Sequence, residues 1–132
     1  MRIFLVFAIV VLCCYGCRYV PARHEEHWLG GKIDRPGEYD LVKGGYKIFV
    51  GVDSDLVRYR VVDSTGATII RCDDNISVYQ RWGLYWDAAG NLWVQSSDIG
   101  DVVWRPVGGD KYKKEFLDSS SDRLMPEELR RR

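Results

Sequence analysis

Short runs of alternating apolar and polar residues, separated by turn-forming residues, occupy the chain from Gly37 to Leu117. Alternation with a period of two is the pattern of a strand with one buried face. The runs predict strands over 38–43, 46–52, 56–63, 67–72, 76–80, 84–87, 92–95, 102–105 and 111–117. Short strands at this spacing predict an all-β fold, a single small antiparallel meander that closes as a sandwich or a barrel.

Glycine marks several of the turns between these strands. Gly44-Gly45 separates the first two runs and predicts a β-hairpin. The segment 63–66 (Asp-Ser-Thr-Gly) predicts a second hairpin in which Gly66 takes a positive φ. The last run, 111–117, alternates charged and aromatic residues. We expect it to be an edge strand, because lysine discourages unwanted pairing at an exposed edge.

Residues 1–17 have the layout of an export signal. Arg2 precedes an apolar run from Ile3 to Leu12, and small or sulfur-containing residues follow it up to Gly16 and Cys17. A signal peptide has this order of charged, apolar and small-residue regions. The apolar run is shorter than the roughly twenty residues that a spanning helix needs, so an uncleaved membrane anchor is the weaker interpretation.

The segment 14–17 (Cys-Tyr-Gly-Cys) resembles the cleavage box of bacterial lipoproteins. In that class a small residue precedes an invariant cysteine, which is lipidated and becomes the mature N-terminus. The resemblance covers residues 1–17 alone, and it departs from the class at Cys14, where leucine is usual. It implies lipidation of Cys17 and attachment to the extracytoplasmic side of a membrane in the cell envelope, because several acyl chains anchor a domain stably. Ordinary secretion, with cleavage near Gly16 or Cys17 and no lipid, is the alternative.

Cys72 is the only cysteine of the sequence beyond residue 17. If Cys17 is lipidated, Cys72 has no intramolecular partner, and its position at the end of an alternating run predicts a small core residue. A disulfide between Cys17 and Cys72 is the competing interpretation for a secreted protein without lipid.

Two flanking segments differ from the β-rich body. Residues 18–36 carry mixed charge, two prolines and a Gly-Gly pair without apolar periodicity, and they predict a tether with little regular structure. Residues 118–132 predict a polar tail with a short helix, because Pro126 and two glutamates precede a run of arginines. The predicted organisation is therefore a signal at 1–17, a tether at 18–36, a β-domain at 37–117 and a tail at 118–132.

Charge excludes one class of partner. Removal of residues 1–16 takes away Arg2, one of 19 basic residues, and leaves 18 basic against 19 acidic residues. This balance gives no electrostatic reason to expect nucleic acid. The remaining length of about 115 residues is enough for one domain with a modest core.

The sequence contains residue types that bind metals in three segments, but none of these segments has the spacing of a metal site. Segment 24–27 (His-Glu-Glu-His) would place two imidazoles on one helix face, but it is one residue shorter than the zinc-protease motif and lies in the predicted tether. The acidic segments 53–55 and 73–75 lack the spacing of a calcium loop and are expected to be turns. We expect no metal and no other cofactor.

Catalytic motifs are also lacking in the sequence. Ser96 and Ser97 precede Asp98, but there is no Gly-x-Ser-x-Gly, and both histidines lie far upstream. We therefore expect a protein that is not an enzyme. The alternative is a small extracytoplasmic hydrolase whose site is assembled from scattered carboxylates.

Aromatic residues are concentrated in the middle of the body: Tyr79, Trp82, Tyr85, Trp86, Trp93 and Trp104. Core packing is expected for most of these rings. Strand alternation places Trp86 on the core face and both Tyr85 and Trp93 on the opposite face. In a sandwich we expect Tyr85 and Trp93 to be exposed and, with Arg81 and Gln95, to bind a protein or a glycan. In a barrel the bulky rings would instead line the interior.

Residues 87–94 (Asp-Ala-Ala-Gly-Asn-Leu-Trp-Val) resemble a hairpin phrase that is common in bacterial extracytoplasmic β-proteins, including propeller blades. One copy implies a turn and a strand, and it does not imply a propeller. The sequence as a whole predicts a membrane-anchored or secreted β-domain, a non-enzymatic binding or envelope-associated lipoprotein. It leaves the oligomeric state open.

Overall fold

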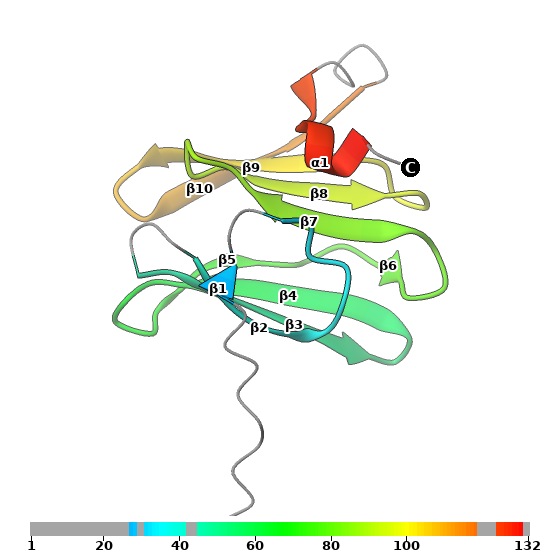
Figure 1. The fold of residues 1–132 in the computed structure, drawn as a ribbon, viewed down its shortest axis with the longest axis horizontal. Helices are drawn as coiled ribbons and strands as arrows, with labels where there is room; N and C mark the ends of the chain where they lie inside the picture. The colour runs from blue at the N-terminus through cyan, green and yellow to red at the C-terminus, as the bar shows by residue number, and fades with distance from the viewer. Residues whose placement is uncertain (1–26, 29–30, 42–44, 119–123, 131–132) are drawn as a thin grey trace, which may run out of the picture.

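Two β-sheets that pack face to face form the body of the computed structural model (Figure 1). The structure describes residues 27–28, 31–41, 45–118 and 124–130. Sheet A contains β1 (His27–Trp28), β2 (Gly37–Leu41), β3 (Lys47–Asp53), β4 (Leu56–Val62), β5 (Thr68–Arg71) and β6 (Ile76–Ser77). Sheet B contains β7 (Trp82–Trp86), β8 (Leu92–Ser96), β9 (Val102–Gly108) and β10 (Lys111–Phe116), and one helix, α1 (Glu127–Arg130), follows it.

The strands follow one another as a meander in each sheet. Sheet A has the order β1-β2-β3-β4-β5, with β6 pairing with β4, and sheet B has the order β10-β9-β8-β7. The pairs are antiparallel except for β1, which runs parallel to β2. The two sheets remain separate, so the predicted all-β meander is confirmed as a sandwich, and each strand range predicted in 37–117 corresponds to one observed strand. The predicted edge strand is β10.

Local turn chemistry explains the hairpins. Ser54 and Asp55 both have positive φ, 51° and 64°, and form the two-residue loop between β3 and β4. Two-residue loops of this kind match the twist of paired strands. Segment 53–55 is therefore a turn, as predicted. Gly66 has a φ of 85° in the turn between β4 and β5, which is also as predicted.

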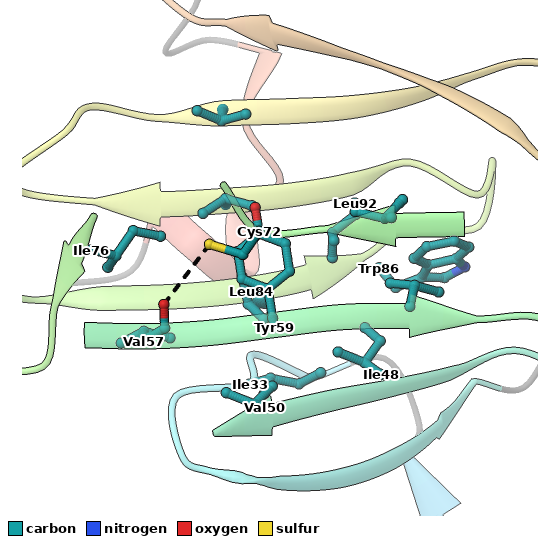
Figure 2. Packing of buried hydrophobic residues seen from close by; sticks show 14 of the residues in the cluster. Ile33, Ile48, Val50, Val57, Tyr59, Cys72, Ile76, Leu84, Trp86 and Leu92 are labelled. Atoms are coloured by element: carbon teal, nitrogen blue, oxygen red, sulfur yellow. Dashed lines mark hydrogen bonds between the residues drawn. The ribbon is translucent and has the colours of Figure 1, made fainter. Parts of the chain in front are cut away.

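Alternate side chains of both sheets fill the space between the layers (Figure 2). The least exposed members of this core are Ile33, Ile48, Val57, Val61, Ile70, Ile76, Leu84, Leu92, Val94 and Val102. Cys72 is also buried here, with its Sγ 3.8 Å from the carbonyl oxygen of Val57. This burial confirms Cys72 as a core residue, whereas Cys17, its partner in the alternative disulfide, lies outside the described residues.

The segment predicted as a tether, 18–36, joins the sandwich before its predicted end. His27 and Trp28 pair with Asp40 and Leu41 at the edge of sheet A. Ile33 is fully buried, and its backbone N–H and C=O each form a 2.8 Å hydrogen bond with Leu84 of sheet B. A single apolar residue among polar neighbours produces no periodicity, so alternation did not reveal this bridge. Residues 18–26 lie outside the described part of the chain.

The helix α1 lies over the outer face of sheet B (Figure 1). Met125 and Leu129 pack there against Trp93 and Val103 in a second buried cluster, separate from the core between the sheets. The predicted short C-terminal helix is therefore present, and the chain's own tail covers one sheet. No helix within the described ranges is long and apolar enough to cross a membrane.

Candidate binding surfaces

Tyr85, Trp93 and Gln95, three of the four predicted binding residues, lie on the outer face of sheet B. Tyr85 and Trp93 are direct partners across β7 and β8, and Gln95 is two residues further along β8. Trp86 faces the core, as alternation predicts. The predicted exposure is wrong for Trp93, because only 4% of its surface is accessible.

Trp93 is buried because the C-terminal tail covers it. Leu129 is fully buried and Met125 nearly so, and both pack in the cluster that contains the Trp93 ring. The indole Nε1–H donates a 2.8 Å hydrogen bond to Asp87 Oδ2, and the guanidinium of Arg105 lies 5.4 Å from the ring centroid. The polar group of this large ring is thus satisfied without water.

Tyr85 and Gln95 help to hold this tail. Tyr85 is half-buried. The pKa of its hydroxyl is raised, mainly by burial and to a smaller extent by the Glu128 carboxylate of α1. The Gln95 side chain donates from Nε2 to the carbonyl oxygen of Leu129 at 2.9 Å, and its Oε1 accepts from Lys32 at 3.3 Å. Two side chains that were predicted to bind a partner therefore contact the chain's own tail.

Arg81 and the serines beside it have structural contacts at the start of β7 and the end of β8. The backbone N–H of Arg81 donates to Ser97 Oγ at 3.1 Å, and Ser97 N–H donates to the Arg81 carbonyl at 3.0 Å. Ser96 donates its hydroxyl hydrogen to Asp98, whose other oxygen accepts from the backbone of Ser77 at 2.8 Å. The exposed Arg81 and the covered Tyr85, Trp93 and Gln95 do not form one open surface.

A lysine joins the two sheets at one side of the sandwich. Lys114 on β10 bonds through Nζ to Asp73 Oδ1 at 2.6 Å and to Asp74 Oδ1 at 3.1 Å, in the loop after β5. Its ammonium also lies 5.6 Å and 5.1 Å from the ring centroids of Trp104 and Phe116. The bond from Lys114 lowers the pKa of Asp73. Segment 73–75 therefore binds a side chain of the protein itself.

Metal-binding geometry is not found in the described part of the chain. Among those residues, no group of three or more His, Cys, Asp or Glu side chains could hold an ion. Of the predicted tether motif at 24–27, residues 24–26 lie outside the described ranges, and the backbone of His27 forms part of β1.

The outer face of sheet A carries basic and aromatic side chains that sequence analysis did not single out. One row crosses four strands, from Glu38 on β2 through Phe49 on β3 and Arg60 on β4 to Arg71 on β5, with each residue directly opposite the next. Arg58 lies on the same face, two residues before Arg60. The sequence indicates this surface along β4, where arginines alternate with buried residues. The same alternation that places the apolar residues in the core places the arginines on the outer face.

Charges on this face are only partly neutralised. Lys47 binds both acids of β2, Glu38 at 2.5 Å and Asp40 at 3.3 Å. The guanidinium of Arg60 stacks over the Phe49 ring, 4.7 Å from its centroid. Arg60 and Arg71 are exposed, and neither forms an ion pair with a carboxylate among the described residues. We call Phe49, Arg58, Arg60 and Arg71 the arginine face.

The tail therefore covers the outer face of sheet B, whereas no described segment covers the basic residues on the outer face of sheet A. An arginine carries several N–H donors in a planar fork that matches the oxygens of a phosphate or carboxylate group. The arginine face thus has the chemistry of an anion-binding surface. Comparisons of this chain with protein-family models, curated proteins and solved structures found no match.

Proposed function

We propose that this chain is a non-enzymatic binding domain of the cell envelope, held on the extracytoplasmic side of a membrane by lipid on Cys17. The observation that carries the proposal is the order of features at the N-terminus: a charged residue, an apolar run and a small residue directly before Cys17. The folded sandwich supports it, because β1 begins at His27, shortly after this segment. A protein or a glycan of the envelope is the expected partner.

The contacts of the acidic residues favour binding over hydrolysis. Hydrolysis by paired carboxylates needs one group that donates a proton and another that attacks or activates water. Asp73 and Asp74 bind Lys114, and Asp98 accepts hydrogen bonds from Ser96 and from the backbone of Ser77. These carboxylates stabilise loops of the sandwich, so no specific observation supports the hydrolase alternative.

Intact mass of the mature protein, purified from bacterial membranes, tests the anchor. We expect a chain that begins at Cys17 and carries the additional mass of its acyl groups. Cys17→Ser should retain residues 1–16 and carry no lipid. Cys14→Leu restores the residue that lipoprotein signals usually have, so it should give the same mature mass as the natural sequence. A mature chain without added mass in the soluble fraction would instead establish secretion and contradict the anchor.

A further inference from the structure

We infer that the arginine face docks onto anionic lipid headgroups and orients the sandwich with sheet A toward the membrane. The inference rests on the proposed lipid anchor for bringing the domain to a membrane. Its test is separate, because it concerns charged side chains that lie far along the sequence from Cys17.

The pairing of Arg60 with Arg71 is the first argument. They are direct cross-strand partners on β4 and β5 and both are exposed. Side chains in this relation start about 5 Å apart, and like charges there repel each other and destabilise the sheet. No described carboxylate pairs with either arginine. A negatively charged ligand would relieve this repulsion, and a phosphate group can accept hydrogen bonds from both guanidinium groups.

The openness of the surface is the second argument. Gly51 on β3 lies opposite Arg58, and a Cβ atom built at this glycine would meet nothing within 4 Å. Phe49 supports the guanidinium of Arg60 from one side at 4.7 Å, which leaves the edge of the guanidinium available to oxygens of a ligand. Headgroups can therefore reach the exposed Arg60 and Arg71 without displacing any described segment, whereas Arg58 donates to the carbonyl oxygen of Asp74 at 2.7 Å.

The position of the anchor is the third argument. The N-terminal strand β1 joins the edge of sheet A beside β2, so the chain enters the sandwich through the sheet that carries the arginines. Nine residues, 18–26, separate Cys17 from β1. Even fully extended they span at most about 30 Å. A lipid at Cys17 would thus hold sheet A close to the membrane, at a distance where anionic headgroups attract basic side chains.

Vesicle experiments with the mature protein test the docking. The protein is added to vesicles of phosphatidylcholine alone or of phosphatidylcholine with phosphatidylglycerol, and arginine modification by phenylglyoxal is followed by peptide mass spectrometry. We expect modification of Arg60 and Arg71 to slow severalfold on the anionic vesicles and to recover at high salt. Arg81 and Arg130, which are exposed elsewhere, should react equally on both. Equal rates for Arg60 and Arg71 on the two kinds of vesicle would overturn the inference.

A pair of matched variants separates docking from anchoring. Arg60→Gln/Arg71→Gln should weaken the salt-sensitive binding to anionic vesicles by about fivefold for each arginine removed, whereas Arg81→Gln/Arg130→Gln removes the same charge without this effect. Flotation with neutral vesicles reports the lipid anchor alone and should not change in either variant. Flotation with neutral vesicles combined with no arginine protection on anionic vesicles would overturn the docking but not the anchor. Arginine protection on anionic vesicles without flotation on neutral ones would overturn only the anchor. Protection by inorganic phosphate without vesicles, combined with equal modification rates on the two kinds of vesicle, would indicate a small-anion site and contradict a lipid surface.

Discussion

The two outer faces of the sandwich differ in what lies over them. Each sheet buries its inner face against the other, and its outer face then meets water or a cover. On sheet B the outer face carries Trp93 and Val103, and the tail covers them with Met125 and Leu129. On sheet A it carries Phe49, Arg60 and Arg71, and no segment in the described part of the chain covers them.

The difference follows from what each side chain gains by losing contact with water. An indole buries a large apolar area, and burial of such area stabilises the fold in proportion. A guanidinium loses hydration when it is covered and gains only where a counter-charge replaces the water. A cover over Trp93 therefore stabilises the protein, whereas a cover over Arg60 and Arg71 would have to be anionic.

Removal of the covered aromatic ring should have the largest effect. Trp93→Ala should lower the free energy of unfolding by about 3–5 kcal/mol, because it empties the centre of a buried cluster. Phe49→Ala, on the arginine face, should cost about 1 kcal/mol, because that ring is only partly buried. Urea denaturation of both variants checks the comparison. Equal losses of unfolding free energy in the two variants would show that the ring of Trp93 is no better covered than the ring of Phe49.

Shortening of the covering side chain should have the next largest effect. Leu129→Ala should cost about 2–3 kcal/mol, with an upper limit set by the free energy of detaching the tail. Leu124→Ala is the matched control, since 64% of Leu124 is exposed, and it should change stability by less than about 0.5 kcal/mol. The backbone amides of β7 and β8 should exchange hydrogen faster in Leu129→Ala and at an unchanged rate in Leu124→Ala. Unchanged exchange there would mean that Leu129 does not hold the cover in place.

Alkaline pH should loosen the covered face by a smaller amount. Burial and the Glu128 carboxylate raise the pKa of Tyr85 in the folded state above its ordinary value of 10.0. The folded protein therefore keeps this proton more firmly than the unfolded chain does. The corresponding stability is complete below pH 10.0 and is lost as the pH rises from there through the folded pKa.

A tyrosinate absorbance titration measures this shift. Glu128→Gln removes the negative charge beside Tyr85, so the Tyr85 phase should move to lower pH, and Tyr85→Phe should remove that phase. Tyr112 is an internal control, because burial and its own neighbours, Tyr46, Asp110 and Asp87, raise its pKa to about 12. A shift of both phases would point to a general change of the fold rather than to the contact with the tail.

Sequence alternation was enough for the strands and for which residues share a face. It placed Tyr85 and Trp93 together and Trp86 on the core side, and the pairing of β7 with β8 confirms both. It could not indicate whether the second face is covered, because the cover comes from a distant segment: Gln95 bonds to Leu129, 34 residues away. The spacing of Met125 and Leu129, one helical turn apart in a polar tail, was the available signal.

Part of the arginine face also follows from the sequence. The run of β4 shows Arg58 and Arg60 alternating with buried residues, which assigns both arginines to the outer face. Their relation to Arg71 was not readable, because the register of β4 with β5 shifts between Val61 and Val62. A shift of one residue moves a side chain to the other face, so only the structure shows that Arg60 and Arg71 are neighbours.

Reversal of one charge on the arginine face should give the smallest effect, and it should be favourable. Arg71→Glu turns the repulsive pair with Arg60 into an attractive one and should raise the free energy of unfolding by about 0.2–1 kcal/mol, with Arg71→Gln in between. High salt should reduce the gain, because both side chains are exposed. A loss of stability would show that Arg71 has a favourable contact in the natural protein. A gain in stability combined with weaker protection of Arg60 on anionic vesicles would mean that Arg71 lowers the stability of the fold and strengthens the binding of anionic lipid. On sheet B, by contrast, the residues of the outer face stabilise the fold.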